Sequence, residues 1–382
     1  MSNHPIVKPH PNQTLLFEEG LAKCIKERPS GLQPLRLVVP SVHFRDWLQL
    51  QIARRFGICM GFEFSMPQDF VVEVFRAAGI ERAADWTKRH LEWAILEKIC
   101  ASPKILPLLP ENASIRNRFA MARAVADRFD QYAHFRPEMF EAWSQGRGFL
   151  QKPDHRAEEA WQRDLWNKLF EKFGNDPGLL PQRLNNVEAA AKLRDAFRAV
   201  TVIGSGSLDP LLMETLHVLS TSGVGVDIRV ILPCLGYLAD IRKQNQSGNL
   251  ALPDSSSNPE DFKLGPEVQN NPLLVSMARH AVGAFVLIGE KGHQYDNWPD
   301  PGDLVEQSNP NTLLKRIQQG VRANSEYAKV DGLNADDSLR IHECYGARRE
   351  LEVLRDELLR AFSDIEDLEP EDVLIAVPSF ED

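Results

Sequence analysis

The sequence lacks the residues that nucleotide hydrolysis requires. A P-loop ends in Gly-Lys-Ser/Thr, where backbone amides cradle phosphate and the lysine neutralises its charge, and no Gly-Lys dipeptide occurs anywhere in the 382 residues. A helicase-type hydrolase also places an Asp-Glu pair after a central strand. Here the apolar run 199–203 leads into Gly204, Ser205, Gly206 and Ser207, which offer no carboxylate. We therefore predict that this chain hydrolyses no nucleotide.

Cysteine is also sparse, and long apolar runs are missing. The five cysteines include no CxxC pair and stand far from any histidine cluster, so neither a zinc nor an iron–sulfur site is expected. No stretch approaches 18 uninterrupted apolar residues, and the amino terminus has no basic segment leading into an apolar one. We expect a cytoplasmic protein with reduced thiols, neither exported nor membrane-spanning.

The charge balance limits how the chain can meet nucleic acid. Lys and Arg number 44 and Asp and Glu number 54, which gives a formal net charge of −10. Non-specific coating of nucleic acid depends on many basic contacts to phosphate. Any contact with DNA must therefore be local.

Short apolar runs rich in β-branched residues predict buried parallel strands. They occupy residues 35–39, 199–203, 226–232, 339–342 and 373–377. Helical periodicity extends over residues 87–100, 115–132, 157–173, 209–219 and 348–362. Asp209 followed by Pro210 predicts the N-cap of one of these helices. Strand alternating with helix predicts an α/β fold, with a parallel sheet covered on both faces.

The spacing of these elements predicts the domain organisation. About 160 residues of almost purely helical pattern separate the first two strand runs, which is far more than one crossover helix needs. We predict a helical subdomain at about 81–195, inserted into a sheet core at about 1–80 and 196–330. Residues 331–382 then correspond to the start of a second α/β domain, truncated soon after its second strand.

The helix at 116–132 is the most informative one. Its arginines recur on one face, while Phe119, Ala122, Ala126 and Phe129 form an opposing apolar stripe. One interpretation is a solvated charged face. The alternative is a lining for single-stranded nucleic acid, in which arginine meets phosphate and the Asp127 and Asp130 carboxylates accept hydrogen bonds from base amino groups. Helix geometry alone leaves both open.

The same helix carries a family resemblance. The segment ADRFDQY at 126–132, with His134, Arg136, Pro137 and Trp143 after it, resembles the ADxFDQY…RPxW…W signature of the RecC family, the gamma chain of exodeoxyribonuclease V. Other segments are similar to that family in the same order: FGI at 56–58, AWQ at 160–162, NPLL at 271–274 and RELEVL at 349–354. The order and spacing hold over nearly the whole chain.

This resemblance implies a superfamily 1 helicase-like fold, here 1–330, that has lost its ATPase residues, with the start of a second helicase-like domain at 331–382. It implies a non-catalytic subunit of a bacterial helicase–nuclease that repairs double-strand breaks by homologous recombination. Such a subunit binds RecB-like and RecD-like motors, which use ATP and magnesium, and needs no cofactor itself. It helps to split duplex DNA ends and channels the single 3′ strand for recognition of the Chi hotspot.

Carried over residue by residue, Asp127, Asp130 and Arg136 match family positions that face the threaded strand or support that surface. Other positions depart from the family. Where relatives place polar Gln and Thr side chains after the first strand run, this chain has Pro40, Val42 and Asp46, and a family Trp is absent around Met66 and Val72.

Two alternatives stay open. An AddB-like or catalytic helicase–nuclease subunit would need a P-loop near its amino terminus. A generic interaction module would make no contact with DNA.

Overall fold

A computed structural model describes most of the chain, and its residues form two compact units. The described residues are 6–10, 12–26, 34–80, 86–102, 105–150, 153–174, 184, 186–204, 208–231, 234, 271–277, 294–295, 312–325 and 336–377. The first unit comprises residues 1–307 and 319–327, and the second comprises residues 308–318 and 328–382.

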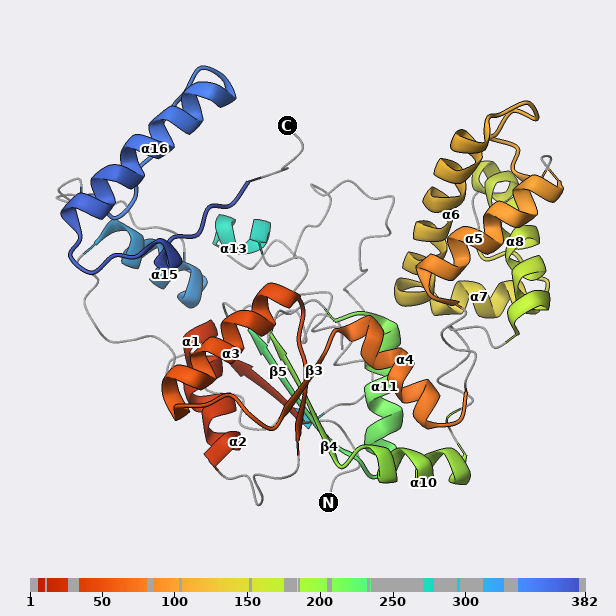
Figure 1. The fold of residues 1–382 in the computed structure, drawn as a ribbon, viewed down its shortest axis with the longest axis horizontal. Coiled ribbons are helices and arrows are strands. Elements are labelled where there is room, and N and C mark those ends of the chain that lie inside the picture. Colours follow the sequence, from red (N-terminus) through yellow and green to blue (C-terminus); the bar gives the residue numbers. More distant parts are fainter. Residues whose placement is uncertain are drawn as a thin grey trace. The chain divides into compact units, whose positions relative to one another are not determined.

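A parallel sheet forms the centre of the first unit (Figure 1). In the order β3-β2-β4-β5-β1-β6, every neighbouring pair is parallel. The strands are β1 (Ile6–His10), β2 (Leu35–Val38), β3 (Phe62–Ser65), β4 (Ala199–Gly204), β5 (Gly225–Ile231) and the two-residue β6 (Gln294–Tyr295). The predicted strands at β2, β4 and β5 are confirmed. The pattern missed β1, whose IVKPH sequence holds a lysine and a proline, and the edge strand β3, whose FEFS sequence alternates.

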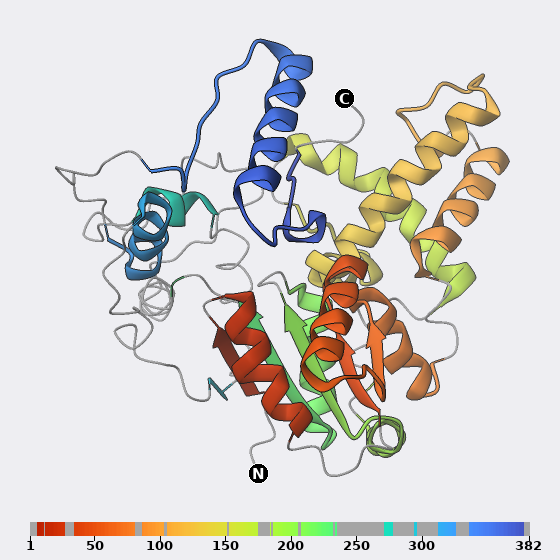
Figure 2. The ribbon, with the colours of Figure 1, turned by 60° about the vertical axis from the view of Figure 1, so that its left-hand side comes forward.

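Helices cover both faces of this sheet, as the alternation of strand and helix predicted (Figures 1 and 2). On one face, α4 (Pro67–Ala77), α10 (Val187–Ala196) and α11 (Pro210–Thr221) pack on residues such as Val38, Val202 and Ile228. On the other, η1 (Leu16–Leu21) and α3 (Val42–Phe56) pack on Leu37, Val39 and Ile203, with the short α1 (Gln13–Leu15) and α2 (Ala22–Lys26) flanking η1. Successive side chains of a strand point to opposite faces, so β2, β4 and β5 each contribute side chains to both cores.

Four helices that lie between β3 and β4 in the sequence form a separate hydrophobic core. They are α5 (Lys88–Ala101), α6 (Ile115–Phe135), α7 (Pro137–Ser144) and α8 (Pro153–Phe173), here called the helical insertion. Aromatic side chains fill its centre, where the Phe140 and Trp166 rings stack with centroids 3.7 Å apart and Phe129 meets Trp166 edge-on at 5.6 Å. The insertion therefore has a hydrophobic core of its own, distinct from the two cores of the sheet.

The second unit corrects two strand predictions. Its α16 (Gly346–Asp364) confirms the predicted helix at 348–362, and a 3-10 turn follows (Pro370–Asp372). The segments 339–342 and 373–377, however, form no strand in the structure. A β-strand needs a hydrogen-bonded neighbour, and side chains in these segments are open to solvent, with Ile341 89% and Leu374 92% exposed. The apolar pattern there marks residues suited to burial that stay exposed in this unit.

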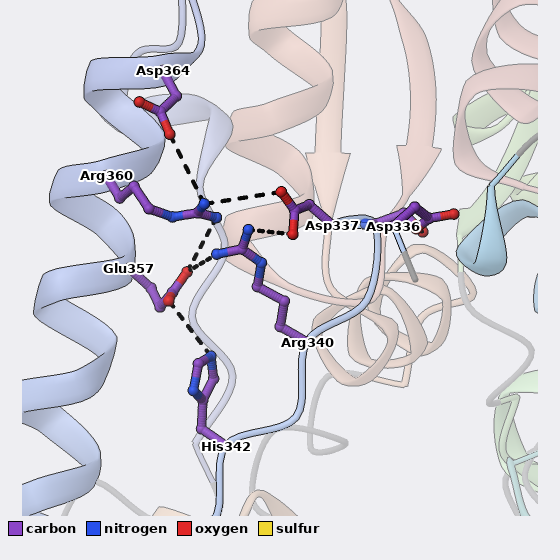
Figure 3. Close-up of polar contacts among 8 residues, drawn as sticks. Asp336, Asp337, Arg340, His342, Glu357, Arg360 and Asp364 are labelled. Carbon is purple, nitrogen blue, oxygen red and sulfur yellow. Dashed lines mark hydrogen bonds and ion pairs between the residues drawn. The ribbon is translucent and has the colours of Figure 1, made fainter. Parts of the chain in front are cut away.

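An ion-pair network connects residues 337–342 to α16 (Figure 3). Arg340 reaches Asp337 at 2.5 Å and Glu357 at 2.7 Å, and Arg360 lies 3.5 Å from Glu357. His342 lies 3.6 Å from the other oxygen of Glu357. Exposed ion pairs contribute little singly, but a network of several charges can fix the geometry of a surface segment.

At the carboxyl edge of the sheet, Pro40 packs closely against the last residue of β4, Gly204. Gly204, the last residue of β4, has a φ of +130°. A Cβ at this position would lie 2.7 Å from Cδ of Pro40, which follows the end of β2. At the same edge Ser41 caps α3 and Asp209 caps α11, each through a side-chain oxygen that accepts an amide hydrogen bond. The cap predicted for Asp209 is thus confirmed.

Gly204→Ala tests this close approach. The substitution combines backbone strain with overpacking, and we expect it to lower the free energy of unfolding by about 2–4 kcal/mol. Gly57→Ala is the matched control, because Gly57 also has a positive φ, +79°, but its Cβ would meet nothing within 4 Å. Strain alone should cost about 1 kcal/mol there. Urea denaturation followed by tryptophan fluorescence measures both, and equal effects would contradict the role of Pro40.

Candidate nucleic-acid interface

Helix α6 presents one apolar face to the insertion core and one polar face outward. Ala122, Ala126 and Phe129 are buried, as the predicted stripe requires, while Phe119 is half-buried with its ring 5.5 Å from that of Trp93. The helix begins at a Ser114 cap, whose hydroxyl oxygen accepts a hydrogen bond from an amide of the first turn. The arginines at 116, 123 and 128 are exposed.

Asp127 lies on the polar face and is paired. The Lys88 ammonium at the start of α5 contacts its Oδ1, and the Gln131 amide donates to its Oδ2 at 3.2 Å. The hydrogen bond from Lys88 lowers the pKa of the Asp127 carboxyl below its usual range. A carboxylate has about four lone-pair sites, so Asp127 keeps acceptor capacity beyond these two contacts.

Asp130 and His134 lie one turn apart on the side of α6 that faces the sheet. Nδ1 of the buried His134 lies 3.2 Å from Oδ1 of Asp209, the residue that caps α11. Burial lowers the pKa of His134, but the contact with Asp209 and the charge of Asp130 outweigh burial and raise it above its usual value. Burial raises the pKa of the Asp130 carboxyl. The contact between His134 and Asp209 joins the helical insertion to the sheet.

A cavity of about 240 Å³ opens where the insertion meets α4 and α11. Asp130 and His134 line it from α6, and Lys88 lines it from α5. Val72, one of the positions that depart from the family pattern, lines it from α4. The structure therefore brings Asp130 and Lys88 to one cavity, with Asp127 beside it through its pair with Lys88.

Arg136 stands apart, at the junction of α6 and α7. Its backbone amide donates to the carbonyl of Tyr132 at 2.8 Å and closes α6, and the next residue, Pro137, opens α7. Arg136 is half-buried and does not line the cavity. The three predicted residues thus follow α6 from its middle to its carboxyl end.

Sequence reasoning missed two residues of this site. Lys88 occurs in a predicted helix with nothing in its neighbourhood to single it out. His134 stands out in the sequence only as part of the family signature, and its partner Asp209 only as a helix cap. The meeting of α5, α6 and α11 was needed to connect them.

Two kinds of feature are missing from the described residues. Within the described ranges, no three His, Cys, Asp or Glu side chains gather in a way that could hold a metal ion. No helix in the part of the chain that the structure describes is long and apolar enough to cross a membrane.

His134→Gln tests the contact between the insertion and the sheet. A raised folded-state pKa means that the stabilisation is complete below the unfolded pKa of about 6.5 and is lost as pH rises through the folded value. We expect the free energy of unfolding to fall by about 1 kcal/mol at pH 6 and by less at pH 9. Urea titrations at both pH values measure this, with His155→Gln, at an exposed position of α8, as the control. A pH-independent loss would contradict the ion pair.

Comparison with known proteins matches this chain to one family. The family model described as RecC, N-terminal domain, matches residues 10–324. RecBCD enzyme subunit RecC of Escherichia coli strain K12 is 25% identical over 94% of this chain and 36% of its own length. The RecC subunit of Mycolicibacterium smegmatis is 26% identical over 97% of the chain and 33% of its own length, and that of Haemophilus influenzae is 25% identical over 96% and 37%.

The chain spans about a third of the length of these curated relatives. Within the chain, the family match runs from the end of β1 to the end of α15 (Leu313–Ala323) and so includes the helical insertion and both cores of the sheet. Because this match covers well over half of the 382 residues, the chain belongs to the RecC family through its amino-terminal domain.

Proposed function

We propose that this chain is the non-catalytic, DNA-handling part of an ATP-dependent helicase–nuclease that repairs double-strand breaks by homologous recombination. In this role it binds RecB-like and RecD-like motor subunits, helps to split duplex DNA and guides the 3′-ended strand for hotspot recognition. Membership of the RecC family supports the proposal, as does the name of the relatives, RecBCD enzyme subunit RecC.

The residues at the strand ends support a non-hydrolysing role. After β1, Asn12 caps α1 by accepting a hydrogen bond from the Leu15 amide at 2.8 Å, where a P-loop would present glycine amides and a lysine to phosphate. At the end of β4 the backbone of Gly204 is packed against Pro40. In a parallel sheet, ligands bind at this carboxyl edge, and here the contact of Pro40 with Gly204 occupies part of it.

One observation supports DNA-strand handling most directly: α6 places Asp130 in the cavity where the insertion meets that edge, with Asp127 beside the cavity through its pair with Lys88. On this proposal their carboxylates accept hydrogen bonds from base amino groups, and Lys88 and the exposed arginines of α6 contact phosphate. Arg136 supports this surface from the end of the helix. The departures at Pro40, Val42 and Asp46 lie after β2 and on α3, so we propose that the sequence read by this chain differs from that read by its relatives.

The domain division is part of the same proposal. Residues 1–330 form a helicase-like domain that has lost its hydrolase residues, with a helical insertion at about 81–195, and residues 331–382 begin a second such domain. Exposed apolar side chains in the second unit support this, because soluble proteins rarely leave large apolar patches uncovered. They include Ile341, Leu351, Leu359, Leu374 and Ile375.

The decisive test separates strand recognition from ATP hydrolysis. Asp127→Ala and Arg136→Ala are introduced into the protein assembled with RecB-like and RecD-like subunits, and sequence-dependent pausing on a DNA library is measured beside ATP turnover. We expect recognition to weaken about tenfold, as for the loss of one base contact, while ATP turnover stays nearly unchanged.

Asp164→Ala is the control, because Asp164 is an exposed carboxylate on α8 that pairs with Lys168 one turn along the same helix, at 2.7 Å. It should change neither measurement. Loss of ATP turnover without loss of recognition would contradict the assignment of Asp127 and Arg136. ATP turnover by this chain alone, abolished by a mutation within it, would refute the non-catalytic role itself.

A further inference from the structure

A second pocket lies within the helical insertion, between the loop that follows α7 and the first turns of α8. Its volume is about 370 Å³. None of the described residues that line it also lines the cavity beside α6. The residues that line it are Gly148, Leu150, Arg156, Glu159, Ala160 and Arg163.

Glu159 holds the wall of this pocket in place. The side chain is buried, and its Oε1 accepts hydrogen bonds from the Trp143 indole at 2.7 Å and from the Phe149 amide at 2.5 Å. Its Oε2 accepts from the Leu150 amide at 3.0 Å. Burial raises the pKa of Glu159, but the hydrogen bonds outweigh burial and lower it, so the carboxylate is charged at neutral pH. Three N–H donors of the protein thus engage its oxygens, and the charge of Arg163 also lowers its pKa.

Two arginines flank this carboxylate on one face of α8. Positions 156, 159, 160 and 163 follow the i, i+3, i+4, i+7 spacing, so Arg156 and Arg163 lie on either side of Glu159 along the helix. The pocket thus brings two guanidinium groups beside a carboxylate whose oxygens already accept three hydrogen bonds. A guanidinium presents a planar set of donors that matches the oxygens of a phosphate.

Gly148 lets the backbone of the loop after α7 lie close to Glu159 and Arg163 of α8. A Cβ at this position would lie 3.4 Å from Oε2 of Glu159 and 3.6 Å from Nη1 of Arg163. The loop backbone therefore lies beside the charged groups with no side chain between them. A ligand in the pocket would meet backbone and guanidinium groups together.

We propose that this pocket binds a phosphate group of the nucleic-acid backbone through Arg156 and Arg163. The inference rests on the proposed function and adds to it a second contact point for the same strand. The pocket lies close in the chain to Arg136, which we proposed to support the DNA-contacting surface. We therefore favour a DNA strand over a carboxylate of a partner protein as the ligand of the pocket. The eight residues of α7, about 12 Å of helix, separate Arg136 from the loop that forms the pocket wall.

The test uses the protein assembled with its motor subunits and duplex DNA that carries 3′ oligodeoxythymidylate tails of increasing length. Fluorescence anisotropy at several salt concentrations compares the wild type with the Arg156→Gln, Arg163→Gln double variant. The wild type and the double variant should bind duplexes with short tails equally well. Once the tail is long enough to reach the pocket, the variant should bind about tenfold more weakly, and its salt slope should fall by about 0.7 for each phosphate that it no longer neutralises.

A second variant keeps the arginines and blocks the pocket. Ala160→Glu places a carboxylate at an exposed lining position, and Ala157→Glu makes the same charge change at an exposed position of α8 that does not line it. We expect Ala160→Glu to reproduce the double variant and Ala157→Glu to bind long tails as the wild type does. This pair still decides the matter if the double variant fails to fold.

Three outcomes would overturn the inference. If pocket variants and wild type bind tails of every length equally while the wild type gains affinity with tail length, the pocket does not touch the strand and the proposed function stands. If the wild type gains no affinity with tail length, the proposed strand path fails as well. If the pocket variants fold but no longer assemble with the motor subunits, the arginines hold a partner's carboxylate instead of a phosphate.

Discussion

The contact between His134 and Asp209 fixes where the helical insertion stands on the sheet. His134 belongs to α6 and Asp209 caps α11, so the pair of the buried His134 and the half-buried Asp209 connects two layers that otherwise have separate hydrophobic cores. Because α6 is a single helix of 21 residues, fixing its carboxyl-terminal turn also sets the position of Asp127 and Asp130. The positions of Asp130, one turn from His134 on the same side of α6, and of Asp127 on its polar face therefore depend on this contact.

The sheet determines where the helices that contact the insertion begin. All its neighbouring strands run parallel, so their carboxyl ends meet at one edge, and α3, α4 and α11 begin there. In a nucleotide hydrolase this edge would hold phosphate and metal. Here Pro40 packs on Gly204, and the Asp209 carboxylate is engaged by a helix cap and by His134. The same edge supports the insertion, and we proposed on this basis that the chain positions a DNA strand and hydrolyses no nucleotide.

Local charge, more than net charge, decides what such a surface can hold. The chain is acidic as a whole, yet Lys88 is set against Asp127, and Arg156 and Arg163 are set around a carboxylate that is already satisfied. A buried carboxylate that accepts several amide hydrogen bonds stays ionised and holds the segments that donate them in place. Glu159 is such a carboxylate, and it holds the loop after α7 beside the two arginines of the pocket.

The sequence by itself determined the α/β class, the strands β2, β4 and β5, the helices α5, α6, α8, α11 and α16 and the family, because periodicity and ordered motifs are local signals. It missed β1 and β3 because a lysine, a proline or a polar alternation hides a strand whose pairing comes from distant residues. It predicted strands at 339–342 and 373–377, where the apolar pattern is present but no neighbouring strand pairs with it. Only the tertiary structure brought Lys88 to Asp127 and His134 to Asp209, since their partners are 39 and 75 residues away along the chain.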